Sequence, residues 1–172
     1  LAEGIGETAR AAQIFKFFAG EALRNAGDAL ASVRPGIDVT IEREAVGVIG
    51  MITPWNFPIA IPAWKIAPAL AYGNAVVLKP ADLVPGCAWE IANILKDAGC
   101  PDGVFNLVMG RGSVVGARIV EHPDVDAISF TGSVPTGRGI AVACAESGKR
   151  VQLEMGGKNP MVVLDDADLE TA

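Results

Sequence analysis

The sequence predicts an α/β fold in which helices cover both faces of a doubly wound parallel sheet. From residue 45 onward, short and nearly continuous apolar runs alternate with helical stretches. Such runs are typical of parallel strands that are buried on both faces. The composition agrees with this fold, because 51% of the 172 residues are apolar, and a chain of this length buries a substantial core.

The first 45 residues are expected to form an N-terminal helix and an extended arm. Apolar side chains recur at helical spacing over residues 8–30, and over residues 36–44 they alternate with polar ones as in a half-exposed strand. A strand of this kind offers a free edge for pairing. We therefore predict one domain-like segment, residues 1–45, that carries a helix and an oligomerisation-type strand.

Residues 46–172 are expected to form the second, nucleotide-binding part. The predicted strands are, in order, 46–52, 75–78, 104–109, 127–131 and 151–153. Amphipathic helices bounded by Gly or Pro are predicted between them at 59–71, 85–98, 113–121 and 135–145. Ligands of such folds bind at the carboxyl ends of the strands, where most of the Gly-containing turns of this chain fall.

Charge and hydropathy exclude several classes of partner. The net charge is −6, from 14 Lys and Arg against 20 Asp and Glu, and no basic run could follow a phosphate backbone, so we expect no nucleic-acid partner. No apolar run approaches the roughly 20 residues that cross a bilayer, so we expect no membrane span. The richest apolar region is interrupted by Lys65, Lys79, Asp82 and Glu90.

The cysteines and the first residues bear on location and completeness. Cys87, Cys100 and Cys144 are an odd number without a C-x-x-C pair, which indicates neither a disulfide framework nor a zinc site and favours a reducing cytoplasm. The chain begins with Leu1 and lacks the regions of a signal peptide. We therefore expect it to be a piece of a longer protein.

Two Gly-rich turns leave alternatives open. The first, Gly110 to Gly116, has the spacing G-x-G-x-x-x-G, one residue longer than the dinucleotide fingerprint. It is compatible with a phosphate-binding loop and equally with a tight strand-to-helix turn. The second, Gly132 to Gly137, has the spacing of a P-loop, but Arg138 and Gly139 stand where Lys and Ser or Thr would be required.

For the second turn we expect a different role in nucleotide binding. Ser133 lies at the start of a predicted helix, where free N–H groups and the helix dipole favour an anion. The expected anion is a cofactor pyrophosphate.

Asn56 and Glu154 form the candidate catalytic pair. Asn56 lies between two prolines in the stretch Thr53 to Pro58, and Glu154 ends an apolar strand before the Gly156-Gly157 turn. An amide donor and an acid could serve as oxyanion donor and general base for one carbonyl carbon. The alternatives are an amide that caps the following helix and an acid that is held in a salt bridge.

From Val46 onward the chain resembles the aldehyde dehydrogenase superfamily. Six motifs occur in the family's order: Pro54-Trp-Asn-Phe-Pro58, Trp64-Lys-Ile-Ala-Pro-Ala-Leu70, Gly73-Asn74, Leu78-Lys-Pro80, Phe130-Thr-Gly-Ser133 and Leu153-Glu-Met-Gly-Gly-Lys158. The resemblance implies a Rossmann-like domain that binds NAD or NADP. It also implies that Asn56 holds the substrate oxygen and that Glu154 activates the water that hydrolyses a thioester.

The resemblance assigns further residues to the cofactor. It places Lys79 at the adenosine ribose hydroxyls and Ser133 near the pyrophosphate. Asp82 stands where many NAD-preferring members have a glutamate, and the shorter acid predicts use of both NAD and NADP. The full set of expected cofactor-binding residues is Ile52, Thr53, Trp55, Lys79, Asp82, Gly112, Gly116, Gly132, Ser133 and Gly137.

The function implied by the resemblance is oxidation of an aldehyde to a carboxylate through a cysteine hemithioacetal and thioester. Within the family the chain is most similar to 2-oxoglutarate semialdehyde (2,5-dioxopentanoate) dehydrogenases, with succinate semialdehyde and betaine aldehyde as other candidate substrates. None of the three cysteines has the Gly-Gln-x-Cys context of the family's nucleophile, so we expect residues 1–172 alone to be inactive. The longer parent is expected to be a homo-oligomer, a dimer or tetramer. A catalytically silent nucleotide-binding or interaction module on the same scaffold is the alternative.

Overall fold

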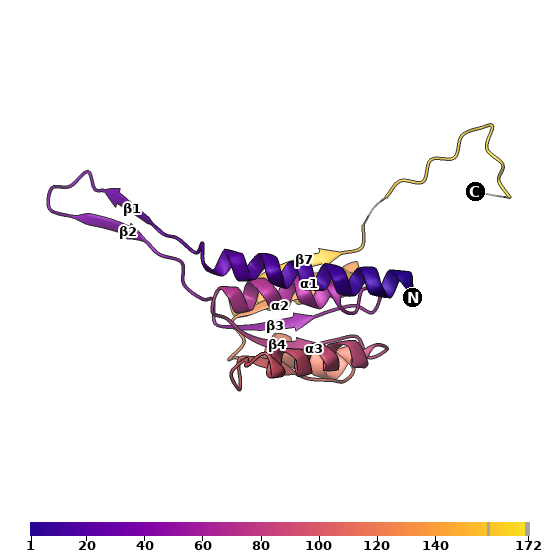
Figure 1. The fold of residues 1–172 in the computed structure, drawn as a ribbon. Coiled ribbons are helices and arrows are strands. Elements are labelled where there is room, and N and C mark those ends of the chain that lie inside the picture. The colour runs from indigo at the N-terminus through magenta and orange to yellow at the C-terminus, as the bar shows by residue number, and fades with distance from the viewer. Residues whose placement is uncertain (158, 171–172) are drawn as a thin grey trace.

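The computed structural model describes residues 1–157 and 159–170 (Figure 1). Lys158 and residues 171–172, which belong to the predicted second segment, lie outside the described residues. The described part of the chain contains a five-stranded parallel sheet and a separate two-stranded hairpin.

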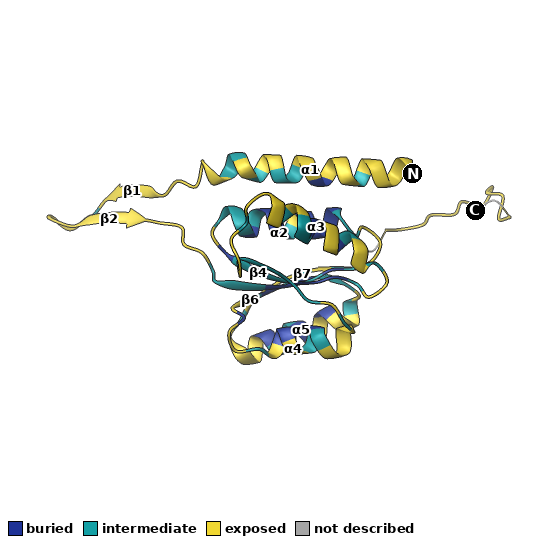
Figure 2. Cartoon of the chain, turned by 60° about the horizontal axis from the view of Figure 1, so that its bottom comes forward, coloured by how far each residue is buried: buried dark blue, intermediate teal, exposed yellow. Residues whose placement is uncertain are grey.

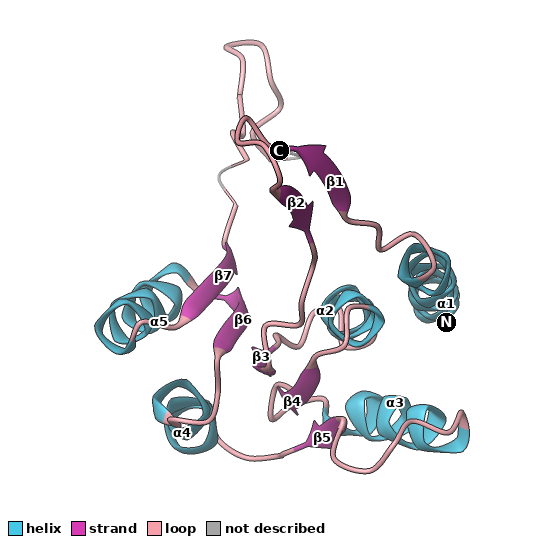
Figure 3. Cartoon of the chain, turned by 90° about the vertical axis from the view of Figure 1, so that its left-hand side faces the viewer, coloured by secondary structure: helices cyan, strands magenta, loops and turns pink. Residues whose placement is uncertain are grey.

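The parallel sheet confirms the predicted α/β class and has the order β5-β4-β3-β6-β7 (Figure 3). Its strands are β3 (Val48–Ile52), β4 (Ala75–Lys79), β5 (Phe105–Leu107), β6 (Ala127–Gly132) and β7 (Arg150–Met155). The chain adds β4 and β5 on one side of β3 and then β6 and β7 on the other side. The order therefore reverses between β3 and β6, and a doubly wound sheet binds ligands at such a point, beside the carboxyl ends of the strands.

Helices cover both faces of the sheet (Figure 2). One face carries α2 (Ala60–Ala71) and α3 (Pro85–Asp97), and α1 (Ala2–Ala22) packs against α2. The other face carries α4 (Ala117–Glu121) and α5 (Val134–Ser147). A short π-helical turn, η1 (Gly112–Gly116), precedes α4.

The alternation of side chains along the strands divides the core into two clusters. One cluster, with Ile66 and Leu78 fully buried, lies between the sheet and the helices α2 and α3. The other, with Ile128 and Cys144, lies between the sheet and the helices α4 and α5. Successive strand residues point to opposite faces, which explains why the nearly continuous apolar runs of β3, β4 and β6 predict strands covered on both sides.

The N-terminal prediction is wrong in part. Helix α1 ends at Ala22, and residues 28–30, the end of the predicted helical stretch, belong instead to β1 (Asp28–Ala31). This strand pairs antiparallel with β2 (Asp38–Ile41), so the expected single extended strand is a hairpin. The reason lies at Gly27, where a Cβ would collide with the carbonyl oxygen of Ile41. Glycine permits this close approach, and pairing satisfies backbone groups that a lone strand leaves free.

Two further elements differ from the prediction. The predicted helix 113–121 is divided into η1 and α4. Strand β7 is longer than predicted, and most of its residues are exposed, in contrast to the doubly buried strands β3, β4 and β6. In the described part of the chain no helix covers β7 on the face that carries α2 (Figure 3). No described helix is long and apolar enough to cross a membrane.

Candidate active site

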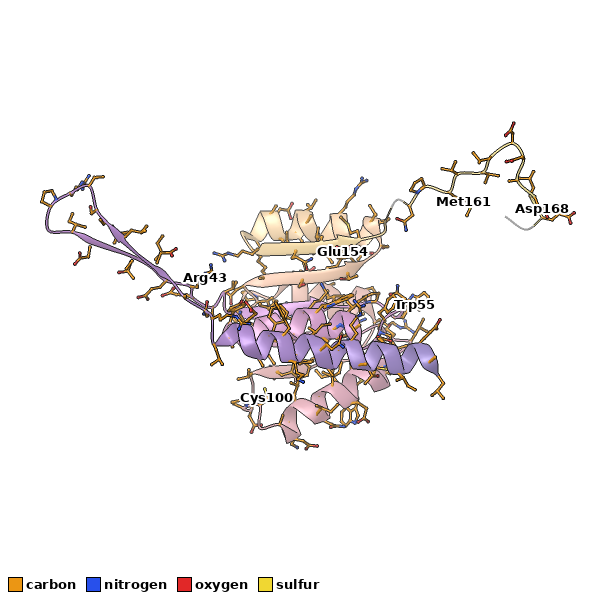
Figure 4. All side chains as sticks on the ribbon, turned by 45° about the horizontal axis from the view of Figure 1, so that its top comes forward. Arg43, Trp55, Cys100, Glu154, Met161 and Asp168 are labelled. Atoms are coloured by element: carbon orange, nitrogen blue, oxygen red, sulfur yellow. The ribbon has the colours of Figure 1, made fainter. Side chains whose placement is uncertain are left out.

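The predicted site residues gather at the carboxyl edge of the parallel sheet, either at the ends of its strands or in the loops and helix starts that follow them. Asn56 and Glu154 come from different elements, the loop after β3 and the end of β7, and both line one cavity of about 1030 Å³. The cavity lies between α2 and the uncovered face of β6 and β7. Figure 4 shows Trp55 and Glu154 toward the end of the molecule from which the C-terminal residues depart.

Asn56 is held by the backbone on both sides of its loop. On one side the N–H of Thr53 donates to the carbonyl oxygen of Lys79 at 3.2 Å. On the other side Glu7 Oε1 accepts hydrogen bonds from the N–H groups of Ile59 at 2.7 Å and Ala60 at 2.9 Å. The capping role that was the alternative for Asn56 thus belongs to Glu7 from α1.

The Asn56 side chain itself is exposed. Within residues 1–157 and 159–170 it makes no hydrogen bond. Its amide is therefore available to a ligand in the cavity.

Glu154 is exposed on β7, where it pairs in register with Thr131 of β6. The alternative of a salt-bridged acid is not seen, because the two salt bridges of the described residues join Arg24 to Glu21 and Lys79 to Asp82. The carboxylate faces a cavity that also has apolar walls, including Trp64 and Met155. This arrangement leaves an acid free to take a proton from a bound molecule.

Lys65 is a site residue that the sequence analysis missed. Its Nζ donates to Ser129 Oγ at 2.8 Å and to Gln152 Oε1 at 3.2 Å, on the same cavity wall as Glu154. Burial lowers the pKa of Lys65 to about 8, and the negative charge of Glu154 opposes this shift. The available indication in the sequence was a lysine inside the predicted apolar helix 59–71 and within the motif Trp64 to Leu70.

Lys79 and Asp82 lie on the other side of the switch point. Lys79 ends β4 and is 4% exposed, which is unusual for a lysine. Its Nζ donates to Asp82 Oδ1 at 2.7 Å, and no other hydrogen bond of this ammonium is seen among the described residues. A buried ammonium with one carboxylate retains donors for hydroxyl or phosphate oxygens.

A second cavity, of about 480 Å³, opens between η1, α4 and α5. Three expected cofactor-binding residues line it, namely Ile52, Gly112 and Gly116. The turn before it contains Gly110, whose φ of 144° is a conformation that favours glycine. The Gly110 to Gly116 segment is therefore both a tight turn and one wall of a cavity.

Ser133 connects the two cavities. It is the N-cap of α5 and borders the first cavity together with Gly132. Its Oγ lies 2.9 Å from the hydroxyl of Thr136, which lines the second cavity. Thr136 was not predicted, although a hydroxyl three residues after a helix cap is a recognisable pattern.

Gly137 has a packing role in the structure. It lines neither of these two cavities, and a Cβ at this position would collide with the sulfur of Met155, so a glycine lets α5 approach β7.

The residues on this side fit a dinucleotide. Thr53 Oγ1 is buried at the carboxyl end of β3 and has no hydrogen-bond partner among the described residues, and such a group gains from a ligand oxygen. The volume of the second cavity lies in the usual range for small-molecule pockets. Lys79, Thr53 and the Gly-lined wall are the groups that would hold the cofactor.

The three cysteines lie away from this chemistry. Cys144 is fully buried, and neither cavity is lined by any of the three. Burial raises the pKa of Cys87, with a further rise from the Glu7 carboxylate, and burial likewise raises the pKa of Cys144 against the effect of Lys149. Since the thiolate is the nucleophilic form, these two thiols are poor nucleophiles. The described residues contain no group of three or more His, Cys, Asp or Glu that could hold a metal ion.

Comparison with known proteins gives consistent results. A model described as the aldehyde dehydrogenase family matches residues 1–172. The chain is 50% identical over 172 residues to an alpha-ketoglutaric semialdehyde dehydrogenase of Bacillus subtilis and covers 35% of that protein. It is 49% identical over 166 residues, 96% of its length, to an alpha-ketoglutarate semialdehyde dehydrogenase of Haloferax volcanii and covers 34% of that protein.

Among solved structures, a betaine aldehyde dehydrogenase of Staphylococcus aureus in complex with NAD+ superposes with a TM-score of 0.90 at 39% identity. The match covers 98% of this chain and 34% of that one. The chain thus spans about a third of the length of the curated relatives that it matches.

Proposed function

The chain belongs to the aldehyde dehydrogenase family, and from this premise we propose that it carries part of the machinery for NAD(P)-dependent oxidation of an aldehyde to a carboxylate. The observation that carries the proposal is the shared cavity of Asn56 and Glu154. The two residues lie 98 positions apart in sequence (154 − 56). A free amide donor and a free carboxylate facing one cavity suit chemistry at a single carbonyl carbon.

In the proposed reaction the two residues have different tasks. The Asn56 amide donates a hydrogen bond to the aldehyde oxygen as the carbonyl carbon becomes tetrahedral, which stabilises the developing negative charge. Glu154 accepts a proton from the water that releases the acid. The dinucleotide, when bound, supplies the acceptor for the hydride. The proposal places the nucleophilic thiol outside residues 1–172, because Cys87, Cys100 and Cys144 line neither cavity.

The proposed cofactor is NAD or NADP. The relative from Staphylococcus aureus was solved with NAD+, and the second cavity, the buried Lys79 and the unpaired Thr53 hydroxyl support the same group here. The remaining expected contacts, from Trp55, Gly132 and Ser133, border the first cavity. Asp82 is already engaged with Lys79, which leaves it less able to exclude a 2′-phosphate and supports dual use.

The proposed substrate is a semialdehyde such as 2-oxoglutarate semialdehyde. The support is that the relatives from Bacillus subtilis and Haloferax volcanii, which are 50% and 49% identical to this chain, are named as dehydrogenases of this semialdehyde. Succinate semialdehyde and betaine aldehyde are further candidates, the second because of the similarity to betaine aldehyde dehydrogenases.

The test is an oxidation assay with the protein that the gene encodes. The three aldehydes are compared at equal concentration with NAD+ and with NADP+, following the reduced nicotinamide and the carboxylate product. We expect turnover to be highest with 2-oxoglutarate semialdehyde. Binding of the dinucleotide without oxidation of any aldehyde would favour the alternative, a silent nucleotide-binding module, which the position of the three cysteines supports.

Three coarser properties are also proposals. We propose a division into residues 1–45 and 46–172, and a cytoplasmic location, which the three free thiols support. We also propose a homo-oligomer, dimer or tetramer, because the β1–β2 hairpin extends from the body and exposes Leu30, Val39 and Ile41 (Figure 1). A two-stranded hairpin is marginally stable by itself. Sedimentation of the protein with and without residues 28–41 tests this role.

A further inference from the structure

We propose that Glu7 is a positioning residue for Asn56, and that α1 thereby takes part in oxyanion stabilisation. This inference rests on the proposed function. Glu7 lies in the second turn of α1, outside the nucleotide-binding segment, and its carboxylate reaches the N-terminus of α2, directly after the loop that carries Asn56.

Glu7 supplies a cap that α2 does not supply for itself. The first N–H groups of a helix have no partner within the helix, and the N-cap of α2 is Ile59, whose side chain cannot accept a hydrogen bond. Glu7 Oε1 accepts from both Ile59 N and Ala60 N at 2.7 and 2.9 Å. A carboxylate at this end of a helix is also favoured by the helix dipole.

The cap fixes one of the two ends of the Asn56 loop. The other end is fixed where the N–H of Thr53 meets the carbonyl oxygen of Lys79. Between these anchors lie residues 54–58, which begin and end with proline and have Asn56 at their centre. Proline restricts φ, so the loop has little freedom while both anchors hold.

The consequence for Asn56 follows from its lack of partners. Its amide makes no hydrogen bond with other described residues, so no polar partner among them holds the amide, and the backbone of its loop sets where the side chain begins. An oxyanion donor acts only when it meets the position of the developing charge within hydrogen-bond distance. Loss of the hydrogen bonds from Ile59 and Ala60 to Glu7 is therefore expected to weaken transition-state stabilisation more than it weakens cofactor binding.

Four variants and one control variant separate an effect on the position of Asn56 from an effect on stability. Glu7→Ala removes the acceptor, whereas Glu7→Gln keeps an amide oxygen that can accept the same two hydrogen bonds. Asn56→Ala and the double variant Glu7→Ala/Asn56→Ala complete a cycle. Glu3→Ala is the matched control, because Glu3 is exposed on the same helix.

Two readouts are taken. The first is hydrogen exchange of the Ile59 and Ala60 amides, and the second is kcat, KM and cofactor Kd of the protein that the gene encodes. We expect Glu7→Ala to speed exchange at both amides and to lower kcat about tenfold, a part of the 100- to 1000-fold loss typical when such a donor is removed. Cofactor Kd should stay unchanged, Glu7→Gln should restore most of kcat, and Glu3→Ala should behave as the unaltered protein.

The double-variant cycle shows whether Glu7 acts on kcat through Asn56 or through a general effect on the protein. In the Asn56→Ala background, Glu7→Ala should lower kcat no further, since the donor that it positions is gone. An equal loss in both backgrounds, an unchanged kcat, or unchanged exchange at Ile59 and Ala60 overturns the proposal. If the unaltered protein oxidises no aldehyde, the proposed function fails, and the exchange result alone then decides whether Glu7 fixes the loop.

Discussion

The ammonium of Lys65 on α2 donates a hydrogen bond of 2.8 Å to Ser129 Oγ on β6, and the same hydroxyl donates to Gln152 Oε1 on β7 at 2.7 Å. Ser129 and Gln152 are partners in the register of β6 with β7. A cation, a hydroxyl and an amide thus share the cavity wall with Glu154. Because the cation is partly desolvated there, its protonation is coupled to the stability of the fold.

Lys65 is expected to make stability depend on pH in the alkaline range. Its pKa is lowered from 10.5 to about 8 by burial, so between these values the unfolded chain binds more protons than the folded one. Stability therefore rises with pH across this window. After a discount for solvent screening, the contribution of Lys65 should change by about 1 to 2 kcal/mol.

The measurement is urea unfolding of the unaltered chain and of Lys65→Met from pH 7 to above pH 10. Only the difference between the two chains is interpreted, because other groups titrate in both. We expect the unaltered chain to gain stability relative to Lys65→Met as the pH rises through about 8. A difference that does not vary with pH would show that the lysine is not desolvated.

Asn56→Ala should remove most of the aldehyde oxidation. The amide is the oxyanion donor of the proposed reaction, and loss of one such donor lowers kcat by about 100- to 1000-fold. The change should leave the unfolding midpoint nearly unaltered, because the side chain is exposed and unpaired among the described residues. Steady-state kinetics with a thermal melt on the same sample checks both statements. A kcat within about threefold of the original would remove Asn56 from the mechanism.

Glu154→Gln tests the general base with an isosteric side chain. Gln keeps the shape and loses the ability to take a proton, so we expect a decrease in kcat of about 100- to 10,000-fold. The same variant removes the negative charge that raises the pKa of Lys65, so that pKa should fall further. Kinetics at several pH values, together with titration of Lys65 by NMR, measures the two effects separately. Full activity of the variant would assign the proton transfer to another group.

The sequence predicts the central sheet well because its indications are local. The apolar runs that become β3, β4 and β6 are buried on both faces, and Gly or Pro marks the ends of the helices. The N-terminal error at residues 28–30 has a nonlocal cause, since the close approach of Gly27 to Ile41 follows from pairing of β1 with β2. Helical periodicity over a short window cannot report such a contact.

The candidate site divides in the same way. Asn56 and Glu154 carry their chemistry in motifs at strand ends, whereas Glu7, Lys65 and Thr136 reach the site from helices and are identified by their contacts. Ser129 and Gln152 meet only because β6 and β7 are in register. Spacing along the chain does not reveal which helix packs against which loop, so the contacts that bring these residues to the site could not be predicted.

Asp82→Glu should shift cofactor use toward NAD. In the unaltered chain Lys79 Nζ holds Asp82 Oδ1 at 2.7 Å, and Asp82 remains partly exposed while Lys79 is buried. A carboxylate one methylene longer extends farther past the ammonium, where it can accept ribose hydroxyls and repel a 2′-phosphate. We expect the ratio of the NADP to the NAD dissociation constant to rise about tenfold, which corresponds to about 1.4 kcal/mol.

Calorimetric titration with each dinucleotide measures the ratio, and Asp97→Glu, the same change at the exposed end of α3, is the control. A strong preference of the unaltered protein for NAD would contradict dual use, and an unchanged ratio in Asp82→Glu would show that this position does not face the ribose.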